Sequence, residues 1–181
     1  RMSRGLGDVY KRQRPLFEDK SVAAVGEIGL DHHWTVPRQE QYDLFEAQLQ
    51  LAKELDLPVS VHDREAHAEM YELLRKYKPR GALHCYSGSA DDAAWLVEQG
   101  MYLGFGGAVT YKGAKRAAKV LAAIPHERAL LETDCPYMAP EPVRGTRNDS
   151  RNIAHVAAYI GTIWDMDAGG NRPRPPLDGA P

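Results

Sequence analysis

The sequence predicts an α/β fold, a (β/α) barrel of the TIM type with about five of its eight β/α units. From residue 21 onward, short apolar runs alternate with longer amphipathic stretches, which is typical of a parallel sheet covered by helices. The apolar runs carry few polar residues on either face, as strands buried on both sides do. Polar side chains collect where these runs end, and a (β/α) barrel keeps its chemistry at the carboxyl ends of its strands.

The 181 residues are enough for one domain with a substantial core, and 43% of them are hydrophobic. Residues 1–14 hold five basic residues and one acidic residue without periodicity, so we expect a disordered or foreign leader there. The alternative for this segment is a basic arm that grips phosphate. Residues 15–167 are expected to form a partial barrel domain. Residues 168–181 are rich in glycine and proline, which predicts a disordered tail.

The first half of the chain contains two predicted strands, each followed by a helix. Residues 22–28 form an apolar run that continues into Gly-Leu-Asp and predicts the first strand. Residues 35–56 place apolar side chains at helical spacing, and Pro58 closes this helix. The short run at residues 59–61 predicts the second strand. Helical spacing returns over residues 65–78 and ends before another proline.

Two further strands and helices are predicted beyond this point. Residues 82–86 form the third strand. The next helix is expected over residues 89–100, because Ser-Ala-Asp-Asp has the form of a capping box and a glycine ends the pattern. A strand at residues 101–105 then leads through a Gly-Gly turn to a helix at residues 113–123.

The last predicted strand, residues 129–132, delivers a carboxylate to a point where the chain can no longer continue as a strand. Asp134 follows the apolar run, and Pro136 lacks the N–H that a ladder needs. After a long loop, Asn148 or Asp149 is expected to cap a final helix.

Four metal-capable side chains lie at or near the ends of predicted strands: Glu27, His62, His84 and Asp134. Taken singly, each histidine could be a hydrogen-bonded core residue, and Glu27 could be a salt-bridged carboxylate at the rim of the sheet. Together they have the composition of a metal site, and successive β/α units would bring them to one rim. Asp134 is expected to be both a metal ligand and a general base, because a hydrolytic site needs a group that accepts a proton from water.

A second group of residues is a candidate for phosphate binding. Arg144 and Arg147 flank Gly145 in the loop before the last helix, where two guanidinium groups could hold a phosphate. The alternative is a pair of solvated surface arginines. Arg64 follows the strand that carries His62 and could reach the same pocket. Trp34 is expected to belong to the core.

The charge balance is nearly neutral, with 23 basic and 25 acidic residues and a net charge of −2. No global field therefore draws the chain to nucleic acid or to an anionic membrane, so any polyanion binding must be local. No apolar run approaches the length of a membrane span. Cys85 and Cys135 each follow a predicted ligand directly, which favours reduced thiols and a cytoplasmic location, with Cys135 as a possible soft ligand.

Several stretches together resemble the TatD family of metal-dependent deoxyribonucleases, within the amidohydrolase-like barrels. The resemblance covers about residues 21–164 and rests on VGEIGLD (25–31), PVSVHDREA (58–66), LHCYSGS (83–89), GGAVTYK (106–112) and LLETDCPYMAPEPVRGTRN (130–148). It implies a TIM-like barrel with two divalent metals, commonly Mg, Mn or Zn, that cuts phosphodiester bonds, typically from a 3′ end of DNA.

The resemblance also implies roles for individual residues. Glu27 would bridge the two metals, His62 and His84 would complete one metal site, and Asp134 would belong to the other. Arg144 and Arg147 fall in the substrate-side loop of the family. The expected partner is a DNA end, and no membrane or protein partner is implied.

The sequence departs from the family pattern in two places. The family opens with a strand bearing a His-x-His pair, and this sequence contains no His-x-His. The tail after about Asp167 does not match the closing helix of the family. We therefore expect a fragment with foreign ends that lacks the first three strands. Besides a TatD-type nuclease, an amidohydrolase or lactonase on the same barrel and a catalytically inactive fragment remain open.

Overall fold

The computed structural model describes residues 12–166, which form two compact units. The first unit comprises residues 12–84 and 98–102, and the second comprises residues 85–97 and 103–166. Residues 1–11 of the predicted leader and the whole predicted tail lie outside the described residues. No helix in the described part of the chain is long and apolar enough to cross a membrane.

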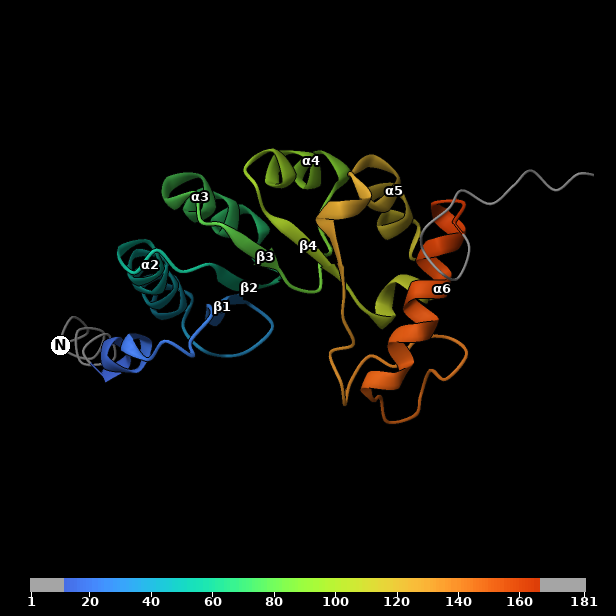
Figure 1. Cartoon of the computed structure of the whole chain (residues 1–181), viewed down its shortest axis with the longest axis horizontal. Coiled ribbons are helices and arrows are strands. Elements are labelled where there is room, and N and C mark those ends of the chain that lie inside the picture. The colour runs from blue at the N-terminus through green and yellow to red at the C-terminus, as the bar shows by residue number, and fades with distance from the viewer. Residues whose placement is uncertain (1–11, 167–181) are drawn as a thin grey trace, which may run out of the picture. The chain divides into compact units, whose positions relative to one another are not determined.

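The first unit is a three-stranded parallel sheet with two helices packed against it (Figure 1). Strand β1 pairs with β2, and β2 pairs with β3, so the strands follow their order in the sequence. Helix α2 packs on β1 and beside α3. The elements of this unit are η1 (Arg14–Glu18), β1 (Val25–Asp31), α2 (Arg38–Glu54), β2 (Val59–Arg64), α3 (His67–Tyr77) and β3 (Gly81–Leu83).

The second unit contains most of the elements from α4 onward. Its strands β4 and β5 are parallel and pair from Leu103 opposite Ala129 to Phe105 opposite Leu131. Helix α6 packs against α5, η2 and β5. In chain order the elements are α4 (Ala90–Glu98), β4 (Tyr102–Phe105), η2 (Gly107–Thr110), α5 (Lys115–Ala123), η3 (His126–Arg128), β5 (Ala129–Leu131), η4 (Ser150–Asn152) and α6 (Ile153–Ile163).

The buried face of α2 shows why this segment folds as a helix on the sheet. Phe45, Leu49 and Ala52 are spaced three or four residues apart and are all buried, so they form one apolar stripe. Leu30 on β1 and Met70 on α3 are also fully buried. The apolar side chains therefore fix these two helices on the strands that carry the candidate site.

Strand β1 begins and ends three residues later than the sequence predicts. Its ladder starts where the N–H of Val25 donates to the carbonyl of Pro58 at 2.8 Å, and it continues until Asp31 lies opposite Arg64. The apolar residues before Val25 are not part of the strand. Glu27, which was predicted to lie near the end of this strand, is therefore its third residue instead. His62 likewise lies within β2 rather than after it.

Other boundaries also differ from the predictions for local reasons. Strand β3 ends at Leu83 instead of residue 86, and Cys85 has a positive φ of 48°, which is incompatible with an extended strand. The predicted Gly-Gly turn is followed by the 3₁₀ helix η2. The cap by Ser89 before α4 is confirmed, because the N–H of Asp92 donates to Oγ of Ser89 at 3.1 Å, while the carboxylate of Asp92 accepts from Oγ rather than from the N–H of Ser89. Of the two predicted caps, Asp149 accepts from the N–H of Arg151 at the start of η4.

Gly29 allows β1 and β2 to approach each other closely. It has a φ of +147°, and a Cβ atom added there would overlap the backbone carbonyl of His62. Gly29 lies opposite His62 in the parallel register. The absence of a side chain at this position is therefore a condition for the pairing that places His62 beside β1.

Candidate metal centre

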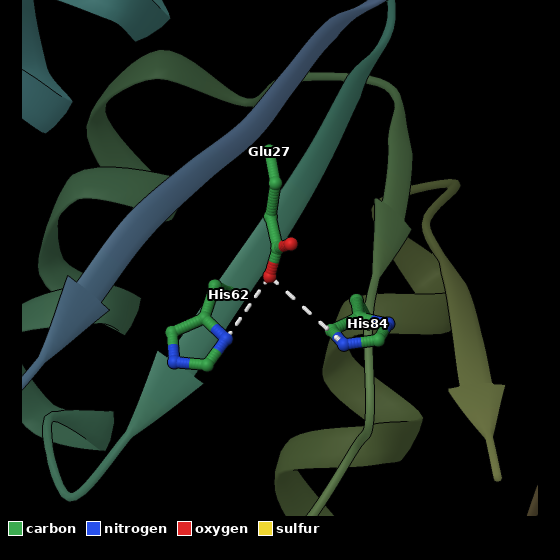
Figure 2. Close-up of side chains that lie close together, drawn as sticks. All are labelled: Glu27, His62 and His84. Carbon is green, nitrogen blue, oxygen red and sulfur yellow. Dashed lines mark ion pairs between the residues drawn. The ribbon is translucent and has the colours of Figure 1, made fainter. Parts of the chain in front are cut away.

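Three of the four predicted ligands come together in the first unit (Figure 2). Oε1 of Glu27 lies 3.0 Å from Nδ1 of His62 and 3.9 Å from Nε2 of His84. One ligand atom from each residue lies within 4.8 Å of the others. Figure 2 shows the carboxylate of Glu27 directed toward both imidazole rings, so the three side chains point to a common space.

The sheet register explains this convergence. Side chains alternate between the two faces of a strand, so Glu27 and Asp31 lie on the same face of β1. His62 lies opposite the intervening Gly29 in β2, between the levels of these two carboxylates. The N–H of His84 donates to the carbonyl of Val61 at 2.8 Å, which fixes the residue just after β3 next to β2.

Asp31 is a site residue that the sequence analysis missed. Its Oδ2 lies 3.1 Å from Nε2 of His62, while its Oδ1 accepts a hydrogen bond from the N–H of His33 at 3.0 Å. Both ring nitrogens of His62 therefore face carboxylates, with Glu27 on one side and Asp31 on the other. A carboxylate behind a metal-binding histidine orients the ring and strengthens its donor nitrogen. The even spacing from Glu27 to Asp31 becomes informative only once β1 is known to extend to Asp31.

The donor atoms of this triad fit a divalent cation. Two imidazole nitrogens and one carboxylate oxygen are a common ligand set for Zn²⁺, and carboxylates also suit Mg²⁺ and Mn²⁺. Glu27 is about half exposed, with 51% of its side-chain surface accessible, while His84 is 19% exposed. The site is thus anchored on one side and open to solvent on the other, which gives a cation an entry path.

Asp134 lies in the second unit, so its convergence with the triad stays a prediction. Its backbone adopts a positive φ of 51° just after β5, and a carboxylate oxygen lies within 4.8 Å of Sγ of Cys85. The N–H of Tyr137 donates to the carbonyl of Asp134 at 3.0 Å. These features turn the chain at Asp134 and confirm that the strand does not continue.

Asn148 holds the loop that carries Asp134, which the sequence analysis did not recognise. Only 3% of its surface is accessible. Its Nδ2 donates to the carbonyl oxygens of Thr133 at 2.6 Å and of Tyr137 at 2.7 Å. Because Thr133 and Tyr137 bracket Asp134, this buried amide ties both sides of the loop together.

Glu132 fixes the turn that follows His84. Its Oε1 accepts a hydrogen bond from the N–H of Cys85 at 2.6 Å. Gly104 leaves room for this carboxylate, because a Cβ atom there would lie 2.7 Å from Oε2 of Glu132. A charge-assisted bond to a backbone N–H is stronger than a neutral one, so Glu132 stabilises the left-handed conformation of Cys85.

The three predicted phosphate-binding arginines lie in different surroundings. The guanidinium of Arg144 stacks over the ring of Tyr111 at 4.0 Å and lies 3.7 Å from Oε1 of Glu141. Burial raises the pKa of Tyr111, against the opposing effect of the Arg144 charge. Arg147 lines a cavity of about 500 Å³. Arg64 ends β2 in the first unit and is exposed.

Trp34 does not belong to the core, so that prediction is wrong. It lies in the loop between β1 and α2, and 64% of its surface is accessible. Its ring meets the ring of His33 edge-on, with the ring centroids 5.4 Å apart. Buried residues of β1 and α2, such as Leu30 and Phe45, form the core of this unit. The indole of Trp34 is not part of that core and lies on the surface.

Asp31→Asn is expected to weaken divalent-cation binding about 10- to 100-fold, because the neutral amide no longer polarises the His62 ring. Isothermal titration calorimetry with Mn²⁺ or Zn²⁺ measures this change. Asp56→Asn is the matched control, since Asp56 is exposed and pairs with Arg80 at the end of α2. An affinity for Asp31→Asn within threefold of the unaltered chain would show that Asp31 does not support the site.

The parallel β/α units and the histidine and carboxylate triad define a (β/α)-barrel type of protein with the ligands of a divalent-metal site. The chain belongs to the family described as TatD related DNase, whose sequence model matches residues 7–170. It is 39% identical over 157 residues to the metal-dependent hydrolase YabD of Bacillus subtilis, covering 84% of this chain and 62% of YabD. It is 37% identical over 166 residues to the 3′-5′ ssDNA/RNA exonuclease TatD of Edwardsiella piscicida, covering 85% of this chain and 63% of that protein.

Solved structures agree with this assignment. The TatD homologue YJJV of Escherichia coli superimposes with a TM-score of 0.80 at 35% identity, covering 86% of this chain and 62% of YJJV. A TatD family hydrolase of Entamoeba histolytica has the same fold, with a TM-score of 0.71 at 22% identity. The predicted fold class and the family resemblance are confirmed. The chain spans about three fifths of the length of the curated relatives described above.

Proposed function

We propose that this chain carries the metal-binding part of a divalent-metal-dependent hydrolase that cleaves phosphodiester bonds of DNA from a 3′ end. The observation that carries the proposal is the convergence of Glu27, His62 and His84 on one space. The name of the exonuclease from Edwardsiella piscicida supports a nucleic acid as the substrate class.

In this proposal, Glu27, His62 and His84 hold Mg²⁺, Mn²⁺ or Zn²⁺, and Asp31 orients His62. When bound, the cation supplies a Lewis acid that stabilises charge on the phosphoryl oxygens and lowers the pKa of water. Asp134 would be a ligand of the second cation that the family resemblance implies, and its carboxylate would accept a proton from the attacking water.

The arginines would hold the phosphates that flank the scissile bond. Arg147 is the favoured residue of the second unit, because it lines a cavity and makes no ion pair among residues 12–166. Arg144 is oriented by Tyr111 and Glu141, so its guanidinium has a fixed direction. Arg64 serves the same purpose in the first unit. Guanidinium groups suit this task because they donate two parallel hydrogen bonds to one phosphate.

The test is metal-dependent release of nucleotides from a 5′-labelled single-stranded oligodeoxynucleotide by the 181-residue chain. We expect release with Mn²⁺ that a chelator abolishes, and a rate lower by about 10²- to 10⁴-fold in Asp134→Ala. Asp91→Ala is the control, because Asp91 is exposed in the first turn of α4. Hydrolysis of an amide or lactone instead would favour the amidohydrolase alternative. Metal binding without hydrolysis of any of these substrates would favour the inactive alternative.

A further inference from the structure

A surface hollow lies directly beside the candidate metal triad. It has a volume of about 490 Å³, and Glu27, Asp31 and His62 line one part of it. Trp34 and Val36, from the loop between β1 and α2, line another part. The hollow therefore combines metal-capable groups with an apolar wall within the first unit.

The apolar wall is unusually open to solvent. Trp34 is 64% exposed and Val36 is 52% exposed. Scattered apolar residues on a surface need no explanation, but neighbouring ones beside a polar site mark a binding surface. An indole offers a broad, rigid face together with one polar N–H, which suits a flat ligand that is itself part polar.

Several hydrogen bonds hold this loop in place without a ligand. Gln41 accepts a hydrogen bond from the N–H of Asp31 at 2.8 Å and donates from Nε2 to the carbonyl of Val36 at 3.0 Å. At the other side of the loop, the N–H of His32 donates to the carbonyl of Arg64 at 2.9 Å. The backbone at both ends of the loop is thus held without a ligand, so stacking on Trp34 would cost less ordering of the chain.

We propose that Trp34, with Val36 beside it, is the stacking platform for an unpaired base of the nucleic acid whose phosphate would be held by a cation bound at Glu27 and His62. This inference rests on the proposed function and adds the residue on which an unpaired base at the end of the strand would stack. Proteins that bind single strands combine aromatic platforms with cationic groups for the backbone. Arg64 would supply such a charge, because it lies opposite Asp31 at the end of the β1 and β2 pair, next to the residues that line the hollow.

Because carboxylates line the hollow, a phosphate can bind there only together with a divalent cation. Glu27 and Asp31 are both carboxylates in the same hollow, and they repel a phosphate by Coulomb interaction. A bound divalent cation would reverse this repulsion, because it places positive charge between them and the phosphate. Binding of an oligonucleotide at Trp34 therefore needs both the base and the cation.

The experiment is quenching of tryptophan fluorescence by oligo-dT in the presence of Mg²⁺, with the 181-residue chain. The other tryptophans are Trp95 and Trp164, so the difference between the unaltered chain and Trp34→Phe isolates the signal of Trp34.

Fluorescence anisotropy of labelled oligo-dT gives the affinity. We expect Trp34→Ala to weaken binding about 5- to 150-fold and Trp34→Phe to retain most of it. Leu16→Ala is the control, since Leu16 is 68% exposed in η1 and does not line the hollow.

An abasic oligonucleotide of the same length distinguishes the contribution of the bases to the affinity from that of the phosphates. It should bind the unaltered chain as weakly as oligo-dT binds Trp34→Ala, and a duplex with blunt ends should bind no better. Equal binding of oligo-dT to the unaltered chain and Trp34→Ala would overturn the inference. Concentration-dependent self-association that Trp34→Ala abolishes, without oligonucleotide binding, would also overturn it and would assign the surface to a protein interface.

These outcomes are distinct from those of the proposed function. If oligo-dT binds through Trp34 but is never cleaved, the platform stands and the nuclease proposal fails. If oligo-dT is cleaved and Trp34→Ala leaves its binding unchanged, the nuclease proposal stands and the platform is excluded.

Discussion

Glu27→Gln is expected to lower the affinity for a divalent cation by more than about 100-fold, a larger effect than the loss of Asp31, which contacts only the His62 ring of the triad. Glu27 supplies the only carboxylate of the triad that it forms with His62 and His84, and its Oε1 faces both histidines. Glutamine keeps the shape of the side chain but removes the negative charge that offsets a dication. Two neutral imidazoles would remain as ligands, too few for a strong site.

Isothermal titration calorimetry with Mn²⁺ and Zn²⁺ measures this loss directly, without any assumption about the substrate. Glu40→Gln is the matched control, because Glu40 lies in the first turn of α2 and is exposed. Circular dichroism verifies that both variants stay folded. A dissociation constant for Glu27→Gln within threefold of that for Glu40→Gln would remove Glu27 from the metal site and, with it, the basis of the proposed function.

Gly29→Ala is expected to destabilise the chain by about 3–5 kcal/mol, near the upper end of the range for single substitutions. An alanine Cβ at this position would overlap the carbonyl of His62, which belongs to the backbone of β2 and cannot rotate away. Strands β1 and β2 would have to separate locally, with loss of their ladder. Because this pairing brings His62 next to Glu27, metal affinity should fall together with stability.

Urea unfolding monitored by circular dichroism measures the change in the free energy of unfolding. Gly100→Ala is the control, since Gly100 also has a positive φ of +90° but a Cβ atom there would meet nothing within 4 Å. It should cost only the backbone strain, about 1–2 kcal/mol. If both substitutions lower the free energy of unfolding equally, backbone strain alone accounts for the loss at Gly29. The close approach of β1 to β2 would then contribute nothing.

The order of the elements could be predicted from the sequence, because the apolar spacing changes with each strand and helix. The cap by Ser89 shows how local chemistry fixes a helix start. The position of β1 could not be predicted in the same way. Residues 22–24 are as apolar as the strand itself, and only the pairing of Val25 with the chain at Pro58 decides where the ladder begins.

The convergence of Glu27, His62 and His84 was predictable because each lies in or next to a strand of successive β/α units. Asp31 was missed because it looks like the start of a turn until the strand is known to include it. Its role depends on the face on which its side chain lies. That face follows from the alternation along β1, which sequence spacing alone does not fix.

Long-range contacts limited the remaining predictions. Arg144 and Arg147 were treated as one clamp, but Arg144 lies against Tyr111, which is far away in the sequence. Trp34 was assigned to the core on its apolar character. Whether an aromatic residue of a loop is covered depends on packing of the whole unit, and no local pattern reports that.

The two hydrogen bonds of Gln41 tie the end of a strand and a surface loop to one side chain. The amide proton of Asp31 lies at the last residue of β1, where terminal fraying normally allows rapid exchange with deuterium. Because the Gln41 carboxamide holds this proton and the Val36 carbonyl at once, exchange of the proton requires that the Gln41 side chain release its bond to Asp31. A single backbone amide thus reports how often this corner of the molecule loosens.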